Sequence, residues 1–249
     1  MIFFIVYRWL GSITGSNLKM MPVKKEPWKE WKHITKLDPD KQITEATLET
    51  IVESGTDAIM ISGTQNITDK NVSQLITLLK GYKIPKILEP ATHDAVVYED
   101  IDYIFVPLVL NSMDLEWIIG KHIEWIKTHE INWDRVIPEG YIVLNPKSAV
   151  AKLTKSVANL TSEEVKAYAE YAEKYLRLPI IYVEYSGTYG DSKLVKDLSE
   201  LITEASLFYG GGIDTKERAT EMKSYADVII VGNVVYTSEE KFLSTVPDL

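Results

Sequence analysis

The chain has 249 residues, with 27 Lys and Arg against 36 Asp and Glu, so its formal net charge is −9. Hydrophobic residues make up 45% and charged residues 25%, a globular composition that excludes a disordered tail or a collagen-like repeat. The acidic balance argues against nonspecific nucleic-acid binding, which needs clustered Lys and Arg. The absence of cysteine excludes disulfides and cysteine nucleophiles, and it fits a cytoplasmic protein.

The first ten residues, MIFFIVYRWL, are apolar but are interrupted by Arg8. A membrane span needs about 20 residues, and a secretory signal places its positive charge before the apolar stretch. We therefore interpret residues 1–27 as an N-terminal extension that is dispensable for function. Residues 28–249 are expected to form one domain.

Short β-branched runs alternate with helical stretches along the rest of the chain. We expect strands at His33–Leu37, Ala58–Ser62, Lys86–Glu89, Tyr103–Pro107, Gly140–Leu144, Ile180–Glu184, Leu207–Gly210 and Val228–Val231. Several are almost continuously apolar, as parallel strands covered on both faces are. The sequences Thr161-x-x-Glu164 and Asp214-x-x-Glu217 are typical of capping boxes at helix starts. Eight strands with helices between them predict a single (β/α)8 TIM barrel, with an open doubly wound sheet as the alternative.

Glycine-rich turns follow the last two predicted strands. Gly210-Gly211-Gly212 precedes one predicted helix, and Gly232-Asn233 ends the last strand. Glycine lets the backbone approach a ligand closely, and N–H groups at a helix start favour an anion. Barrels often bind phosphate with the loops after strands seven and eight. The pair therefore predicts a phosphate site, although each turn alone would be no more than a tight turn.

Polar residues at other strand ends suggest chemistry at the same rim. Lys36 and Asp38 lie two apart on an extended segment, so their side chains share a face. Lysine can neutralise phosphate, while Asp38 with the hydroxyl of Thr64 could hold Mg²⁺. The alternative is a Lys–Asp surface pair. Glu184 ends an apolar strand and is a general-base candidate, or else a structural carboxylate bonded to a neighbouring tyrosine.

Seven motifs, in this order, resemble one known family: WKHITKLDPDK, SGTDAIMISGT, VPLVLNS, EGYIVLNP, YVEYSGTYGD, FYGGGI and VIIVGN. They are similar to the geranylgeranylglyceryl-phosphate synthases, a family of archaeal enzymes with bacterial heptaprenylglyceryl-phosphate counterparts. The similarity runs from Trp28 to near Val246. It implies a TIM-barrel prenyltransferase that joins sn-glycerol 1-phosphate to a polyprenyl diphosphate, releases diphosphate and forms an ether.

The resemblance also implies roles for individual residues. Asp38 and Thr64 would hold Mg²⁺ as the cofactor, and Glu184 would take the proton of the glycerol hydroxyl. Glycerol phosphate would be bound by Lys36, Tyr182, Val183, Glu184, Tyr185, Ser186, Gly187, Gly212, Gly232 and Asn233. The family further implies a homodimer and an apolar groove for the prenyl chain, and we expect peripheral membrane contact for the lipid product.

Donor length is expected to depend on Trp125. Between Ser112 and Lys127, apolar residues cluster on one face of a predicted helix. In the resembled family, this helix carries a large aromatic in archaeal C20 enzymes and a small residue in bacterial C35 enzymes. Trp125 at that position predicts geranylgeranyl diphosphate as the donor.

Three alternative functions stay open. The first is the same reaction with heptaprenyl diphosphate. The second is a phosphate-binding barrel isomerase or lyase, which would need no apolar groove. The third is a noncatalytic prenyl-phosphate carrier, which the presence of Lys36, Asp38, Thr64 and Glu184 disfavours.

Overall fold

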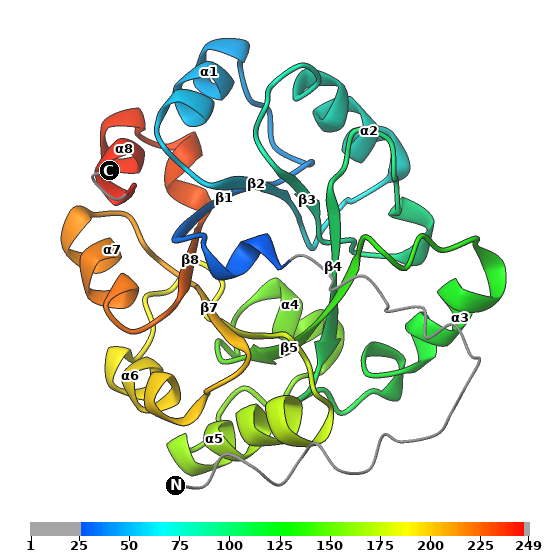
Figure 1. The fold of residues 1–249 in the computed structure, drawn as a ribbon, viewed down its shortest axis with the longest axis vertical. Helices are drawn as coiled ribbons and strands as arrows, with labels where there is room; N and C mark the ends of the chain where they lie inside the picture. The colour runs from blue at the N-terminus through cyan, green and yellow to red at the C-terminus, as the bar shows by residue number, and fades with distance from the viewer. Residues whose placement is uncertain (1–25, 247–249) are drawn as a thin grey trace, which may run out of the picture.

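The computed structural model describes residues 26–246, and these form a closed barrel of eight parallel strands surrounded by helices (Figure 1). The strands are in sequential order around the barrel, and β8 closes it by pairing with β1. They are β1 (His33–Leu37), β2 (Ala58–Ile61), β3 (Lys86–Leu88), β4 (Tyr103–Val109), β5 (Val136–Val143), β6 (Ile180–Glu184), β7 (Ser206–Gly210) and β8 (Val228–Val231). The predicted (β/α)8 barrel is confirmed, and the alternative of an open sheet is wrong.

The helices lie on the outside of the barrel wall (Figure 1). They are α1 (Glu45–Glu53), α2 (Asp69–Leu78), α3 (Gly120–Thr128), α4 (Ala149–Thr154), α5 (Ser162–Glu170), α6 (Ser192–Leu201), α7 (Lys216–Lys223) and α8 (Glu239–Thr245). Short 3₁₀ turns are η1 (Pro27–Lys29), η2 (His93–Ala95), η3 (Leu115–Trp117) and η5 (Asn233–Tyr236), and η4 (Tyr171–Tyr175) is a π-helical turn. None of the helices among residues 26–246 is long and apolar enough to cross a membrane.

Helix starts follow the predicted chemistry with one correction. The capping box between Thr161 and Glu164 is present at the start of α5. At α7, however, the N-cap is Thr215, whose side chain accepts from the Arg218 N–H. Asp214, one residue earlier, instead accepts a 2.7 Å bond from the Arg218 guanidinium. The predicted capping box at Asp214 is therefore wrong, because its carboxylate pairs with a side chain rather than with the helix backbone.

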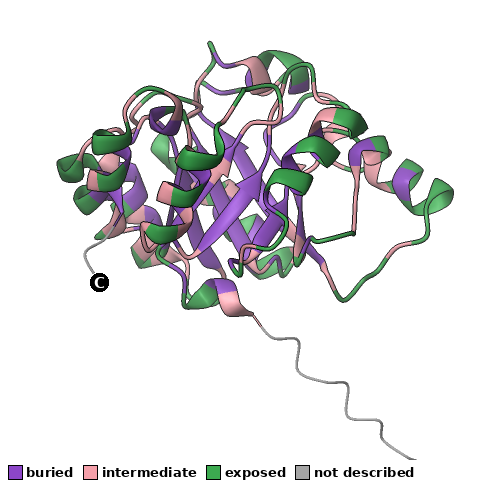
Figure 2. Cartoon of the chain, turned by 90° about the horizontal axis from the view of Figure 1, so that it is seen from above, coloured by how far each residue is buried: buried purple, intermediate pink, exposed green. Residues whose placement is uncertain are grey.

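Buried side chains form two layers, one on each face of the strands. Figure 2 shows the strands as mainly buried and the exposed residues mainly on the outer helices. The outer layer packs the strands against the helices. The inner layer fills the barrel, where Trp28 of η1 meets Phe105 edge-on at 6.0 Å between ring centroids. Since alternate residues of a strand point to opposite faces, this arrangement leaves inward residues at the strand ends to form the site.

The predicted helix between Ser112 and Lys127 is divided in two. The structure has the turn η3 followed by α3, and Trp125 is its buried residue. Three of the apolar residues in this stretch, Leu115, Ile119 and Ile126, are exposed. The single amphipathic helix is thus wrong, because the chain turns between the two pieces and rotates these side chains outward.

Candidate active site

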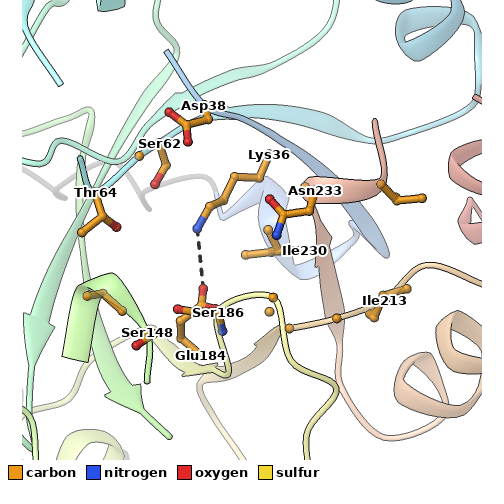
Figure 3. A pocket seen from close by; sticks show the side chains of 18 of the residues that line it. Lys36, Asp38, Ser62, Thr64, Ser148, Glu184, Ser186, Ile213, Ile230 and Asn233 are labelled. Atoms are coloured by element: carbon orange, nitrogen blue, oxygen red, sulfur yellow. Dashed lines mark hydrogen bonds and ion pairs between the residues drawn. The ribbon is translucent and has the colours of Figure 1, made fainter. Parts of the chain in front are cut away.

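A cavity of about 550 Å³ opens at the end of the barrel where the strands end (Figure 3). Loops that follow β1, β2, β6, β7 and β8 line it, together with the first residues of α4. Among the residues predicted from sequence, the lining includes Lys36, Asp38, Thr64, Tyr182, Glu184, Ser186, Gly187, Gly212, Gly232 and Asn233. The fold therefore brings most of the predicted residues together from five loops.

The glycine turns after β7 and β8 form one side of this cavity. Gly212 has a φ of 55°, and a Cβ there would collide with the backbone of Tyr189, so only glycine fits. Asn233 starts η5, and its Oδ1 accepts a 2.9 Å hydrogen bond from Lys41. The Asn233 amide nitrogen lies toward Gly187. Glycine backbone and an amide donor on one wall are suited to binding a phosphate.

Glu184 and Lys36 face each other across the floor of the cavity (Figure 3). The Lys36 Nζ lies 3.6 Å from Glu184 Oε2, and the Glu184 side chain is 4% exposed. Burial alone would lower the pKa of the Lys36 ammonium, but nearby carboxyl groups, Glu184 first among them, raise it above its usual value. The sequence-based alternative of a Lys36–Asp38 surface pair is wrong, because Lys36 points into the barrel and pairs with Glu184.

Two phenols complete the surroundings of Glu184. Its Oε2 accepts hydrogen bonds from Tyr182 at 2.8 Å and from Tyr141 at 3.2 Å, while Oε1 accepts from the Ser186 N–H. Burial, reinforced by the Glu184 charge, raises the pKa of both tyrosines well above the ordinary value. Both phenols therefore stay protonated and can only donate toward the carboxylate, which fixes its orientation.

Asp38 and Thr64 lie on the opposite side of the cavity, on the loops after β1 and β2 (Figure 3). The Asp38 carboxylate sits against the backbone of Gly63, where a Cβ would be 2.6 Å from Asp38 Oδ1. Within residues 26–246, no group of three or more His, Cys, Asp or Glu could hold a metal ion. A carboxylate and a hydroxyl on two neighbouring loops of the cavity fit Mg²⁺, which takes one or two protein carboxylates and completes its shell with substrate phosphates and water.

Two residues of the predicted acceptor segment lie outside the cavity lining. The Val183 side chain is fully buried in the outer core, and Tyr185 packs against Tyr209 at 6.0 Å between ring centroids. Ser186 and Gly187 follow with φ of 41° and 77°, so the chain turns back toward the cavity directly after Glu184. The left-handed turn explains why a small residue and a glycine stand there.

Sequence reasoning assigned no role to four inward residues at and below the floor of the cavity. Tyr141 and Glu139 lie on β5, Glu89 follows β3, and Ser62 follows β2 and donates to Glu89. Glu139 escaped notice because the predicted strand began at Gly140, whereas β5 starts at Val136. The signal was present, since a carboxylate with the same parity as Tyr141 shares its face of the strand.

Trp125 is 5% exposed and lines a second, smaller cavity of about 50 Å³. This cavity lies between α3 and the wall formed by Val106 and Pro107 of β4, with His93 and His122 at its edge. The Trp125 indole nitrogen is buried without a hydrogen-bond partner among the described residues. An indole here can close a groove, as the length-limiter prediction requires.

A parallel eight-stranded barrel with glycine turns after β7 and β8, and with a carboxylate and a hydroxyl across the mouth, has the architecture of a TIM-barrel enzyme for phosphorylated substrates. The chain belongs to the PcrB family, whose family model matches residues 26–248. It is 49% identical over 223 residues to geranylgeranylglyceryl phosphate synthase of Methanoregula boonei, covering 89% of this chain and 98% of that relative. Over 218 residues it is 44% identical to heptaprenylglyceryl phosphate synthase of Bacillus cereus, covering 87% and 95%.

Solved structures show the same fold. The (S)-3-O-geranylgeranylglyceryl phosphate synthase of Thermoplasma acidophilum, in complex with its substrate sn-glycerol-1-phosphate, superposes with a TM-score of 0.76 at 23% identity, over 88% of this chain and 93% of that chain. The wild-type GGGPS of Thermoplasma volcanium superposes with a TM-score of 0.75 at 25% identity, over 88% and 92%. The resemblance found in the sequence motifs is thereby confirmed at the level of the family.

Proposed function

We propose that this protein joins sn-glycerol 1-phosphate to geranylgeranyl diphosphate through an ether bond and releases diphosphate, as a step in archaeal-type membrane lipid synthesis. The observation that carries the proposal is the cavity itself. One wall offers glycine turns for a phosphate, the opposite wall offers Asp38 and Thr64, and Glu184 lies between them. The names of the relatives from Methanoregula boonei and Thermoplasma acidophilum support the same reaction.

The acceptor is held by its phosphate and presents its hydroxyl to Glu184. The turns at Gly212 and Gly232 receive the phosphate, and the Lys36 ammonium balances part of its charge. Within residues 26–246, Glu184 Oε1 accepts only the Ser186 N–H, so its second lone pair is available to the glycerol hydroxyl. Holding two substrates in reacting geometry can supply about 7–11 kcal/mol of the barrier.

The reaction requires no oxidant or reductant. The hydroxyl oxygen forms a bond to the allylic carbon while the bond from that carbon to the diphosphate oxygen breaks. Glu184 takes the hydroxyl proton, a contribution of roughly 10²–10⁴-fold in rate. Mg²⁺ bound with the donor supplies Lewis-acid stabilisation of the diphosphate leaving group. Asp38 and Thr64 are the residues that would hold it, with the remaining ligands coming from the donor and water.

The alternative donor is heptaprenyl diphosphate, which the name of the Bacillus cereus relative favours. Trp125 favours the shorter chain, because its buried indole occupies the space a longer chain would need. The test is incubation with sn-glycerol 1-phosphate, Mg²⁺ and an equimolar mixture of the two donors, followed by mass analysis. We expect the C20 ether and diphosphate as products. Preference for the C35 donor would contradict the donor assignment, and absence of any ether would contradict the reaction.

Homodimer formation, cytoplasmic location and peripheral contact with membranes are further parts of the proposal. Exposed apolar side chains in and beside η3, namely Met113, Leu115 and Ile119, support association with another surface. Analytical ultracentrifugation is expected to give a mass of two chains. Sedimentation with anionic vesicles is expected to carry down a fraction of the protein, and a monomer that stays in the supernatant would contradict both expectations.

A further inference from the structure

Three carboxyl groups and one ammonium lie together inside the barrel, with Lys36 and Glu184 in the cavity lining and Glu89 and Glu139 below it. Glu139 of β5 is 0% exposed, and Glu89, directly after β3, is 7% exposed. Glu184 and Lys36 lie above them as the ion pair already described. The reaction uses Glu184 and Lys36, but it assigns no role to Glu89 and Glu139.

The hydrogen bonds of the two lower carboxyl groups are incomplete. Glu89 Oε2 accepts the Ser62 hydroxyl, yet Glu89 Oε1 and both oxygens of Glu139 have no donor among residues 26–246. An ionised carboxylate can only accept, so two ionised groups facing each other cannot bond. A buried polar group without a partner is costly. One proton between Glu89 and Glu139 removes the conflict, because a protonated carboxyl donates to its neighbour.

The charges that face Glu139 also favour its protonated form. Lys36 from β1 acts on it as a cation, and Glu89 from β3 and Glu184 from β6 act as anions. The Lys36 ammonium is already paired with Glu184. Tyr141 and Tyr182, from β5 and β6, stay neutral. Burial first, and then Glu89, raises the pKa of Glu139 well above its ordinary value. Two carboxyl groups in one buried site typically share a proton in this way.

We propose that Glu139 carries a proton in the folded protein and donates it in a hydrogen bond to Glu89, and that this neutralisation lets an anionic acceptor bind beside Lys36 above three buried carboxyl groups. Glu139 is then a positioning residue that acts through Lys36 and never touches the substrate. The phosphate of the acceptor is a dianion near neutral pH, so a further unscreened negative charge on the floor would repel it in a low-dielectric interior. This inference rests on the proposed function only for the identity of the anion.

The proton on Glu139 can be observed directly in the ligand-free protein. An infrared difference spectrum between wild type and Glu139→Gln at pH 7 is expected to show one protonated-carboxyl C=O band that the variant lacks. Glu173→Gln is the matched control. Glu173 is also buried, but it accepts three backbone N–H bonds and has a pKa lowered to about 2. Its removal is expected to leave the band unchanged, whereas a wild type without the band would overturn the proposal.

Measurements of anion binding test the second part of the proposal, the effect of the proton on the acceptor. The Kd of inorganic phosphate and of sn-glycerol 1-phosphate, measured by calorimetry at pH 7, is expected to differ between wild type and Glu139→Gln by less than about threefold, since one neutral group replaces another. Tenfold tighter binding in the variant would mean that Glu139 was ionised. Tenfold weaker binding by a variant with wild-type circular dichroism would mean that the carboxyl itself is required. Either result overturns the proposal.

Measurements at higher pH distinguish a protonated Glu139 that affects anion binding from a Glu139 with a purely structural role. Wild-type affinity for phosphate is expected to fall only over the pH range in which the infrared band fades, while Glu139→Gln keeps its affinity there. Parallel pH profiles of the two proteins across that range would overturn the proposal. Failure of the proposed function would look different, since no ether would form from any donor while the band and the phosphate affinity stayed as described.

Discussion

Two polar residues three apart on β1 have opposite surroundings. His33 points outward under α8, where its Nδ1 bonds Thr56 Oγ1 at 2.8 Å and its ring meets Phe242 at 6.1 Å between centroids. Lys36 points inward at the mouth, where it contacts Glu184 and faces carboxyl groups with unpartnered oxygens. The first cluster is closed and internally satisfied. The second is left open on the side of the cavity.

The contrast distinguishes two roles of buried polar groups: some stabilise the fold, and others bind a ligand. A buried group that finds its partners within the fold contributes to stability. A site for anionic substrates keeps part of its hydrogen-bonding and charge capacity for a ligand, so its residues carry displaced pKa values and incomplete bonds. Changes at the mouth are therefore expected to alter rates with little effect on folding. Changes in the His33 cluster are expected to alter stability with little effect on rates.

The largest expected effect comes from Glu184→Gln. The amide can hydrogen-bond but cannot take a proton, so turnover is expected to fall roughly 10²–10⁴-fold. The Kd of sn-glycerol 1-phosphate is expected to change by only a few-fold. Single-turnover rates and calorimetry measure the two quantities separately. Normal turnover with a raised KM alone would make Glu184 a binding residue.

Asp38→Asn tests the Mg²⁺ site on the other wall. The variant is expected to fold normally, because Asp38 is only partly buried at a strand end, and to lose most of its Mg²⁺-dependent turnover, about tenfold or more. Asp134→Asn is the control, since Asp134 is an exposed carboxylate outside the cavity lining. Rates are compared at limiting and saturating Mg²⁺. Unchanged activity at limiting Mg²⁺ would remove Asp38 from the site.

Trp125→Ala is expected to admit longer donors, because it opens space beside β4 without touching the chemistry. Truncating a buried tryptophan also costs about 3–5 kcal/mol of stability, so the assay is run well below the melting temperature. Trp31→Ala removes another buried indole, 7% exposed, at the opposite end of the barrel. It is expected to cost similar stability and leave donor length unchanged. Equal length preference in wild type and Trp125→Ala would contradict the limiter role.

His33 provides a pH test of the closed cluster. Burial lowers the pKa of its imidazole to about 3, so the folded state binds no proton where the unfolded chain already does. Stability is therefore expected to fall as the pH drops below about 6.5, by roughly 2–3 kcal/mol between pH 7 and 4.5. Urea unfolding at the two pH values measures this loss. A His33→Asn variant is expected to lack this part of the slope, and identical slopes would contradict the assignment.

The smallest expected effect is that of removing residues 1–20. These residues lie outside the described part of the chain, and the family model begins at residue 26. Turnover and unfolding temperature of the shortened protein are expected to match those of the full chain within about twofold and a few degrees. Failure to fold would show that the extension is needed.

Much of the barrel was predictable, because parallel strands that are buried on both faces are nearly continuous apolar runs in the sequence. The boundary of β5 was not, since Pro138 and Glu139 have low strand propensity and only pairing with β4 and β6 holds them extended. That error hid Glu139, and with it the carboxyl pair. Likewise the helical period alone could not show that the chain breaks between η3 and α3.

The residues of the site were predictable where a polar or charged side chain lies at the end of a predicted strand or in the loop directly after it. Lys36, Asp38, Thr64 and Glu184 all line the cavity as the motifs suggested. Their pairing was not predictable, because local spacing suggested only Asp38 as an alternative partner for Lys36. The actual partner, Glu184, lies five strands further along the chain and meets Lys36 only across the closed barrel. Contacts across a barrel depend on closure, which no local pattern encodes.

The most direct test of the account is a crystal structure of this protein with sn-glycerol 1-phosphate. We predict that the phosphate lies against the backbone at Gly212 and Gly232 and that the terminal hydroxyl lies about 3 Å from Glu184 Oε1. A phosphate bound away from both turns, or a hydroxyl directed away from Glu184, would contradict the account.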